Sequence, residues 1–206
     1  APIMRALNLY RSSMEPILIH TGQHYDPEMS DVFFSDLGVR KPDKFLNCGA
    51  ASHAQQTARS MMAFEEVALA LEPHWIVVVS DVNSTAACSL VAKKLHMQVA
   101  HVQAGLRSGD RAMPEEINRI VTDSISDLFF VTEPAGEQNL LREGHAPEKI
   151  HHVGHVMIDN LLYQAERLAA QSGKELPFAA IKSRLMRYGV VTLHRPSNVD
   201  DPDQLA

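Results

Sequence analysis

Short apolar runs alternate with amphipathic segments along most of this chain. The apolar runs predict buried strands, at residues 17–21, 75–80, 99–102, 128–131, 150–153 and 189–193. Apolar residues at helical spacing predict helices, at residues 1–7, 27–37, 52–71, 85–95, 115–125, 134–143 and 156–170. This alternation predicts the α/β class, with a Rossmann-like, mostly parallel sheet and helices on both faces.

The pattern also predicts how the chain divides into domains. Residues 171–176 are small and polar, which is typical of a connection, and a short helical segment follows them. We therefore expect an N-terminal Rossmann-like domain with its linker over residues 1–176 and the start of a second domain over residues 177–206. The first residues already have helical spacing, so we expect the sequence to begin inside a structural element.

Composition excludes several classes of protein. With 206 residues, 45% hydrophobic and 21% charged, the chain resembles an ordinary soluble globular protein, and no apolar run approaches the roughly 20 residues of a membrane span. The net charge of −6 argues against nucleic acid as a partner. Cys48 and Cys88 lack metal or redox spacing, as expected of reduced cysteines in a cytoplasmic protein. His151, His152 and His155 would point in different directions, so no metal site is predicted.

Candidate functional residues gather directly after the predicted strands, where open α/β sheets bind ligands. Four such clusters occur, at residues 22–24, 81–85, 103–108 and 194–195. Asp81 either caps the following helix or takes part in catalysis, and its position alone favours neither reading. Ser84, at the same helix start, has a hydroxyl that can donate to an anion.

The longest of these segments is HVQAGLRSGDRAMPEEINR, residues 101–119. Its PEE begins a helix, because proline suits the first helical position and acidic residues suit the positive end of the helix dipole. The carboxylates of Glu115 and Glu116 are therefore expected beside a glycine-containing loop. Near the end of the chain, His194 beside Arg195 can serve as a proton donor or a pyrophosphate contact, the alternative being an ordinary surface histidine.

Together these motifs resemble a known enzyme family. VVVSDVNSTAACSLVAKKL, HVQAGLRSGDRAMPEEINRIVTDSISDLFFVTEP, VGHVMIDNL and VTLHRPSN, in this order, are similar to the non-hydrolysing UDP-N-acetylglucosamine 2-epimerases. The resemblance implies two Rossmann-like domains of the glycosyltransferase-B type, with a UDP-sugar bound between them. It also implies that the family's opening strand and most of its second domain are not in this sequence, and that the enzyme is a homodimer.

The resemblance further implies a reaction and a set of residues. UDP-N-acetylglucosamine (UDP-GlcNAc) and UDP-N-acetylmannosamine (UDP-ManNAc) are interconverted by eliminating UDP across C1 and C2 and adding it back, without metal or cofactor. Matching positions imply catalytic roles for Asp81, Glu115, His194 and Gln103, and substrate binding by Arg195, Asn83, Ser84 and Arg107. A second, allosteric UDP-GlcNAc is implied at Gln23, His24 and Gln56.

Two departures from the family pattern affect this expectation. Gln103 stands where the family has the glutamate of HVEAGLR, and an amide cannot accept a proton at neutral pH. Ser80 stands where glycine is usual. The alternatives are therefore a hydrolysing relative that releases ManNAc and UDP, a catalytically weak UDP-sugar-binding homologue, and a glycosyltransferase of the same architecture.

Overall fold

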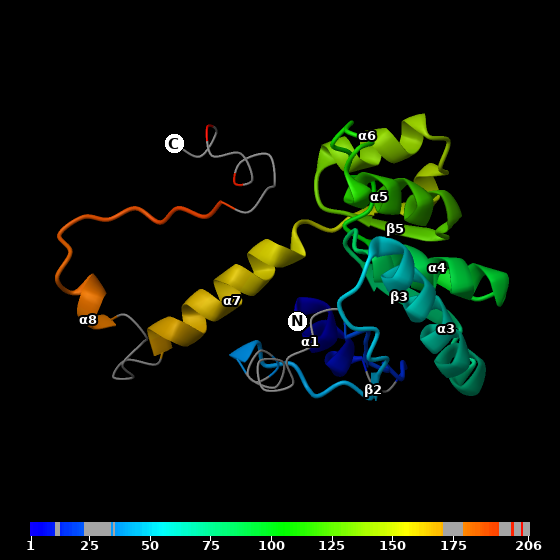
Figure 1. The fold of residues 1–206 in the computed structure, drawn as a ribbon, viewed down its shortest axis with the longest axis horizontal. Helices are drawn as coiled ribbons and strands as arrows, with labels where there is room; N and C mark the ends of the chain where they lie inside the picture. The colour runs from blue at the N-terminus through cyan, green and yellow to red at the C-terminus, as the bar shows by residue number, and fades with distance from the viewer. Residues whose placement is uncertain are drawn as a thin grey trace. The chain divides into compact units, whose positions relative to one another are not determined.

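Four parallel strands form the main sheet of the computed structural model (Figure 1). They are β3 (Trp75–Val79), β4 (Gln98–Val102), β5 (Leu128–Val131) and β6 (Ile150–His152), hydrogen-bonded in that order. The pairing aligns Val79 with Val102, and Val102 with Phe130. Because all four strands run the same way, the loops that follow them meet at one edge of the sheet.

The structure describes residues 1–10, 13–22, 34, 36–170, 179–193, 199 and 203. It divides into two compact units, residues 1–165 and residues 166–206. The first unit contains both sheets and the candidate site. Helix α7 (Val156–Ala170) crosses the boundary, and the second unit also contains α8 (Ala179–Lys182).

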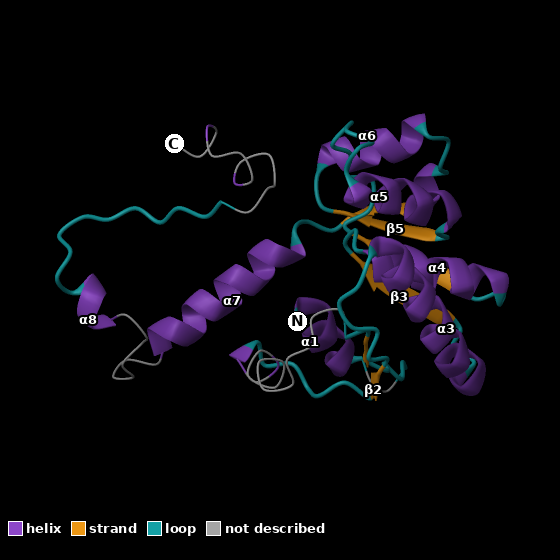
Figure 2. Ribbon diagram, viewed as in Figure 1, coloured by secondary structure: helices purple, strands orange, loops and turns teal. Residues whose placement is uncertain are grey.

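Three helices connect the strands of the main sheet, and Figure 2 shows helices in purple and strands in orange. They are α4 (Asn83–Lys94), α5 (Pro114–Ile125) and α6 (Pro134–Arg142). Since the spatial order of the strands follows the sequence, right-handed crossovers place all three helices on one face. Helix α3 (His53–Leu71) packs beside α4 in the same layer. Alternate residues of β3 point away from this layer, and Trp75, Val77 and Val79 are 40–47% exposed.

Two clusters of buried side chains join the helices to the sheet. The first lies between α3, α4 and the strands β3 and β4, and consists of Phe64, Ala68, Val78, Cys88, Val91, Ala92 and Val99. The second lies between β5 and α6 and consists of Ala104, Phe129, Val131 and Leu140. Each large apolar side chain in them contributes about 1.5–3 kcal/mol on burial. The hydrophobic effect therefore fixes the helices against the strands and, with them, the loops at the strand ends.

The remaining elements of the first unit are small. Helix α1 (Pro2–Leu9) begins the chain, and the 3-10 helix η1 (Pro147–Lys149) precedes β6. Strand β1 (Ile19–His20) pairs in parallel with β2 (Lys44–Phe45) in a separate two-stranded sheet, and Ile19 packs against the first core cluster. The Ser52 side chain caps α3 by accepting from the Gln55 N–H.

Most of the predicted elements are confirmed, and the α/β class with its mostly parallel sheet is correct. The predicted strand at residues 189–193 is wrong, because this segment has no strand pairing and Val190 and Val191 are about 80% exposed. A strand needs a hydrogen-bonded neighbour, and none of the described strands offers one. Most of the predicted helix at 27–37 and the predicted domain boundary at residue 176 lie outside the described residues, and the boundary stays a prediction. No described helix is long and apolar enough to span a membrane.

Candidate active site

Asp81 lies in the turn between β3 and α4, at the carboxyl edge of the sheet. Its carboxylate accepts from Arg119 Nη1 at 2.5 Å and from the Ser80 hydroxyl at 3.1 Å. Its backbone carbonyl accepts from Asn118 Nδ2 at 2.9 Å. The carboxylate does not cap α4, because that helix begins after Val82 without a side-chain cap from any described residue. Helix α5, not α4, therefore holds Asp81 in place.

Arg119 connects Asp81 to a buried carboxylate one turn earlier in α5. Glu116 accepts from Arg119 Nε and Nη2 at 3.0 and 2.8 Å, and from the N–H groups of Ser108 and Gly109 at 3.0 Å each. Burial alone would raise the pKa of Glu116, but the Ser108 N–H, Arg119 and the Gly109 N–H lower it from 4.5 to about 2. Glu116 therefore stays ionised and anchors both Arg119 and the loop after β4.

Glu115 has a different environment from its neighbour. It is half-buried and makes no hydrogen bond or ion pair with another described residue. It stands four positions before Arg119, so the two side chains share one face of α5 about one turn apart. Since Arg119 contacts Asp81, the structure places Glu115 on the side of α5 that carries the Asp81 contact. Of the two adjacent glutamates, Glu115 is therefore the one whose carboxylate is not bonded to another described residue.

The first residues after β3 and β4 adopt an unusual backbone conformation. Ser80 has φ 67° and Gln103 has φ 68°, in the left-handed region that non-glycine residues seldom occupy. Backbone bonds hold both residues there, from Ser80 N to Val102 O at 3.1 Å and from Gln103 N to Phe130 O at 3.0 Å. Such conformations cost about 1–3 kcal/mol and occur most often at functional sites. Gln103 itself is half-buried.

A polar network joins the start of α4 to α3. The buried Asn83 donates from Nδ2 to Gln56 Oε1 at 2.8 Å and accepts at Oδ1 from Asn118 Nδ2 at 3.2 Å. Ser84 accepts a long bond, 3.5 Å, from the Thr21 hydroxyl. Gln56, Asn83 and Ser84 are thus brought together near Asp81.

The guanidinium of Arg107 is held by acidic partners. It contacts Asp123 Oδ2 at 2.7 Å through Nη1 and Glu143 at 2.9 and 2.6 Å through Nε and Nη2. Its Nη1 also donates to the Leu106 carbonyl at 2.7 Å. Most of its donors are therefore occupied within the protein, and Arg107 fixes the loop between β4 and α5.

Comparison with known proteins identifies the family of this chain. The sequence model of the family described as UDP-N-acetylglucosamine 2-epimerase matches residues 8–206. The chain belongs to this family. A UDP-N-acetylglucosamine 2-epimerase from Methanocaldococcus jannaschii is 41% identical over all of this chain and 55% of the relative. A crystal structure from that organism, described as UDP-GlcNAc 2-epimerase in complex with UDP-GlcNAc and UDP, superimposes with a TM-score of 0.86 at 40% identity, over 99% of this chain and 55% of that one.

A second relative differs in its sugar. The UDP-2,3-diacetamido-2,3-dideoxy-D-glucuronate 2-epimerase of Pseudomonas aeruginosa is 41% identical over all of this chain and 56% of its own length. The chain thus spans about half the length of the curated epimerases it matches.

Four of the residues expected from the epimerase resemblance lie outside the described residues. These are Gln23, His24, His194 and Arg195. The structure brings the others together around the carboxyl edge of the sheet, and their roles stay predictions. Within the described part of the chain, no group of three His, Cys, Asp or Glu side chains is placed to hold a metal ion.

The sequence analysis did not identify the residues that hold Asp81 in this candidate site. Arg119 and Asn118 contact Asp81, and they belong to the PEEINR segment that was considered only for its glutamates. Their spacing of three and four positions after Glu115 was a usable signal, because it places them on the same helix face.

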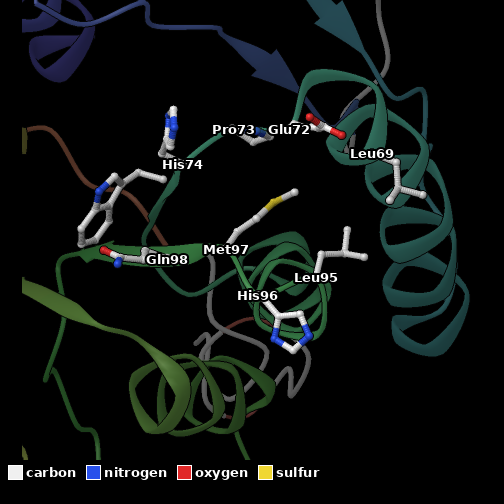
Figure 3. A pocket seen from close by; sticks show the side chains of 9 residues that line it. Leu69, Glu72, Pro73, His74, Leu95, His96, Met97 and Gln98 are labelled. Atoms are coloured by element: carbon white, nitrogen blue, oxygen red, sulfur yellow. The ribbon is translucent and has the colours of Figure 1, made fainter.

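A pocket of about 590 Å³ occurs at the opposite edge of the sheet (Figure 3). It lies beside the end of α3 and the amino ends of β3 and β4, and its lining includes Glu72, His74, Trp75, His96 and Gln98. Because epimerase chemistry is expected at the carboxyl ends of the strands, this pocket is not the candidate active site.

Proposed function

We propose that the full-length protein containing this chain interconverts UDP-GlcNAc and UDP-ManNAc. Family membership carries this proposal, because the family model and the 41% identical archaeal relative both name UDP-N-acetylglucosamine 2-epimerase. The likeness to the jannaschii structure, which is described as holding UDP-GlcNAc and UDP, supports the same substrate here.

The proposed reaction inverts C2 by elimination and re-addition. A base takes the C2 proton as the C1–O bond to UDP breaks, which leaves 2-acetamidoglucal and UDP. UDP then returns to C1 while an acid delivers a proton to the opposite face of C2. No hydride moves in either step as proposed, so the scheme uses no nicotinamide, and it assigns proton transfer and diphosphate contacts to side chains rather than to a metal ion.

Two carboxylates fit the proton-transfer roles. We assign them to Asp81, which Arg119 and Ser80 hold at the sheet edge, and to Glu115, which is not committed to another described residue. We give Glu116 no proton-transfer role, because it is buried, both of its oxygens already accept from Ser108, Gly109 and Arg119, and a carboxylate with a pKa of about 2 is a weak base. His194 and Arg195 are proposed to contact the diphosphate and help UDP leave, with Asn83, Ser84 and Arg107 as the proposed substrate-binding residues.

The deciding experiment follows the sugar by NMR in D2O with the full-length protein and UDP-GlcNAc. The proposal expects UDP-ManNAc carrying deuterium at C2. Free ManNAc with UDP would instead establish the hydrolysing alternative. A parallel reaction with UDP-2,3-diacetamido-2,3-dideoxy-D-glucuronate tests the substrate of the Pseudomonas relative. Turnover of that sugar alone would contradict the proposed substrate while retaining the class of reaction.

Gln103 needs its own test, because it replaces the family's glutamate. If the wild type is active, Gln103 serves catalysis as a hydrogen-bonding group, and Gln103→Glu changes the rate without being required for it. If the wild type is inactive and Gln103→Glu restores turnover, the protein is a catalytically weak UDP-sugar-binding homologue. Gln98→Glu is the matched control, since it makes the same chemical change at the other end of β4.

Two further parts of the proposal concern assembly and regulation. We propose a homodimer, which light scattering on the full-length protein tests directly. We also propose that Gln23, His24 and Gln56 bind a second, activating UDP-GlcNAc. The bond from Asn83 to Gln56 at 2.8 Å supports a link from such a site to the start of α4. If UDP-GlcNAc is both substrate and activator, the rate of its conversion to UDP-ManNAc should depend sigmoidally on its concentration, and Gln56→Ala should abolish the sigmoidal shape.

A further inference from the structure

His101, in the middle of the sheet, is a buried histidine with both ring nitrogens engaged. The residue has no solvent exposure. Its Nδ1 lies 2.6 Å from Asp123 Oδ1 on α5, and its Nε2 lies 2.9 Å from the carbonyl oxygen of Ser80. Nothing in the proposed epimerase reaction uses this side chain, so its two short contacts need another explanation.

The two partners of His101 are both hydrogen-bond acceptors. A backbone carbonyl cannot donate, so Nε2 must carry a hydrogen. The guanidinium of Arg107 lies 2.7 Å from the second oxygen of Asp123 and favours the ionised carboxylate, and the Gly105 N–H donates to the same oxygen at 3.0 Å. Nδ1 therefore also faces an acceptor.

A neutral imidazole has a single N–H and can satisfy only one of these acceptors. We propose that His101 carries a hydrogen on both ring nitrogens in the folded protein and thereby positions the turn that carries Asp81. The charged groups arranged around it are Asp123 from α5 and, behind Asp123, Arg107 from the loop after β4. The inference about activity rests on the proposed function, whereas the inference about protonation does not.

The contact from His101 explains how a strained turn is maintained. Ser80 has a left-handed backbone, and its carbonyl direction sets where the next residue, Asp81, leaves the strand. Asp123, the other partner, holds Gly105 in the loop after β4. One buried ion pair thus ties together the loops that follow two neighbouring strands. His101 is therefore a positioning residue, acting through Ser80 and not on the substrate.

The protonation state is measured directly on the wild-type, full-length protein labelled with ¹⁵N-histidine. The proposal expects one histidine with hydrogens on both ring nitrogens at pH 8, where exposed histidines have lost one. This signal should be absent from His101→Gln. In Asp123→Asn the His101 signal should become that of a neutral imidazole with a hydrogen on Nε2 alone. If no histidine of the wild type is doubly protonated at pH 8, the proposal is overturned, whatever the activity and whether or not the variants fold.

The positioning role is measured by steady-state kinetics of the folded variants. His101→Gln should lower kcat by about 10- to 100-fold, the loss typical of a misplaced catalytic group, while KM changes by less than about threefold. His145→Gln is the matched control, since His145 lies against Phe129 and is distant in role from the site, and its kcat should be unchanged. An unchanged kcat in folded His101→Gln would overturn the positioning role. Absence of epimerase activity in the wild type would contradict the proposed function and leave the NMR result to decide the protonation.

Discussion

Two adjacent glutamates at the start of α5 show how strongly local contacts separate residues of the same type. Glu116 is 2% exposed and surrounded by N–H donors, whereas the half-buried Glu115 makes no bond to another described residue. Sequence reasoning selected Glu115 by its match to the family motif. It could not predict the anchoring role of Glu116, because the donors from Ser108 and Gly109 are brought to it only by the folded loop.

The low pKa of Glu116 predicts how stability depends on pH. A fall from 4.5 to about 2 corresponds to about 3 kcal/mol of stability. Since the folded pKa is the lower one, this contribution is complete above about pH 4.5 to 5.5 and is lost as the pH falls toward 2. In urea unfolding, Glu116→Gln should be less stable than the wild type by about 3 kcal/mol at pH 7.

The difference between the two proteins should narrow steadily below about pH 4.5. Glu115→Gln is the control, and its stability should follow the wild type across the same range. A gap between wild type and Glu116→Gln that stayed constant down to pH 3 would contradict the assigned environment of Glu116.

Substituting Arg119 is expected to lower kcat although its side chain is not proposed to contact the reacting carbon. Its guanidinium bonds Asp81 and Glu116 at the same time, whereas the single ammonium of lysine lacks this fork of donors. In the full-length enzyme, Arg119→Lys should lower kcat roughly tenfold or more, because Asp81 loses its fixed position. Arg142→Lys, on the exposed side of α6, should leave kcat unchanged. Equal kcat values in the two variants would show that Arg119 does not orient Asp81.

Loops and helices meet closely where the β4 loop passes the start of α6. Gly105 has φ +76°, and a Cβ built there would lie 2.3 Å from the carbonyl oxygen of Gly136. Gly109, in the same loop, has φ +75° with nothing within 4 Å of such a Cβ. Both glycines have a left-handed backbone, but only Gly105 lacks room for a Cβ. Comparing them therefore distinguishes the effect of backbone conformation from that of steric contact.

Alanine substitution at these two glycines should therefore have unequal effects. Gly109→Ala should destabilise the protein by about 1 kcal/mol, the typical penalty for a left-handed alanine. Gly105→Ala should cost that amount plus about 1–3 kcal/mol for overpacking. The atom it would meet is the carbonyl oxygen of Gly136, a backbone atom of α6 that cannot rotate away as a side chain could. Urea unfolding of both variants measures the difference. Equal losses would mean that α6 can move away from the loop.

Helices and strands with many apolar residues were predictable from the sequence. Strands that depend on pairing with a neighbouring strand were not. The cores of β3, β4 and β5 are apolar runs, so periodicity alone indicated them. Strand β2 was missed because Lys44 and Phe45 are both exposed and give no apolar pattern. The prediction for residues 189–193 was wrong for the opposite reason. Its β-branched residues have the propensity for a strand, but the segment pairs with no described strand.

Across the first compact unit, the parallel topology explains why distant segments form one site. Asp81 comes from the β3–α4 unit, whereas Gln103 and Glu115 come from the β4–α5 unit, and the carboxyl ends of β3 and β4 share one edge. This general arrangement was predictable from the alternation of strands and helices. The detailed contacts were not, because Arg119, Asp123 and His101 depend on how α5 packs against the sheet.

Binding and chemistry should be separable in the full-length protein through Asp81. If Asp81 transfers protons and other residues hold the diphosphate, Asp81→Asn should retain UDP binding and lose exchange of the C2 proton. Saturating UDP, at about 100 times its Kd, should stabilise both wild type and Asp81→Asn by about 2.7 kcal/mol in thermal unfolding. Over the same period, deuterium uptake at C2 of UDP-GlcNAc should be lost only in Asp81→Asn.

Asp159→Asn, on the exposed surface of α7, provides the control for removing one negative charge and should match the wild type in both measurements. Loss of UDP stabilisation in Asp81→Asn would assign Asp81 to ligand binding, and retained exchange would exclude it as the base.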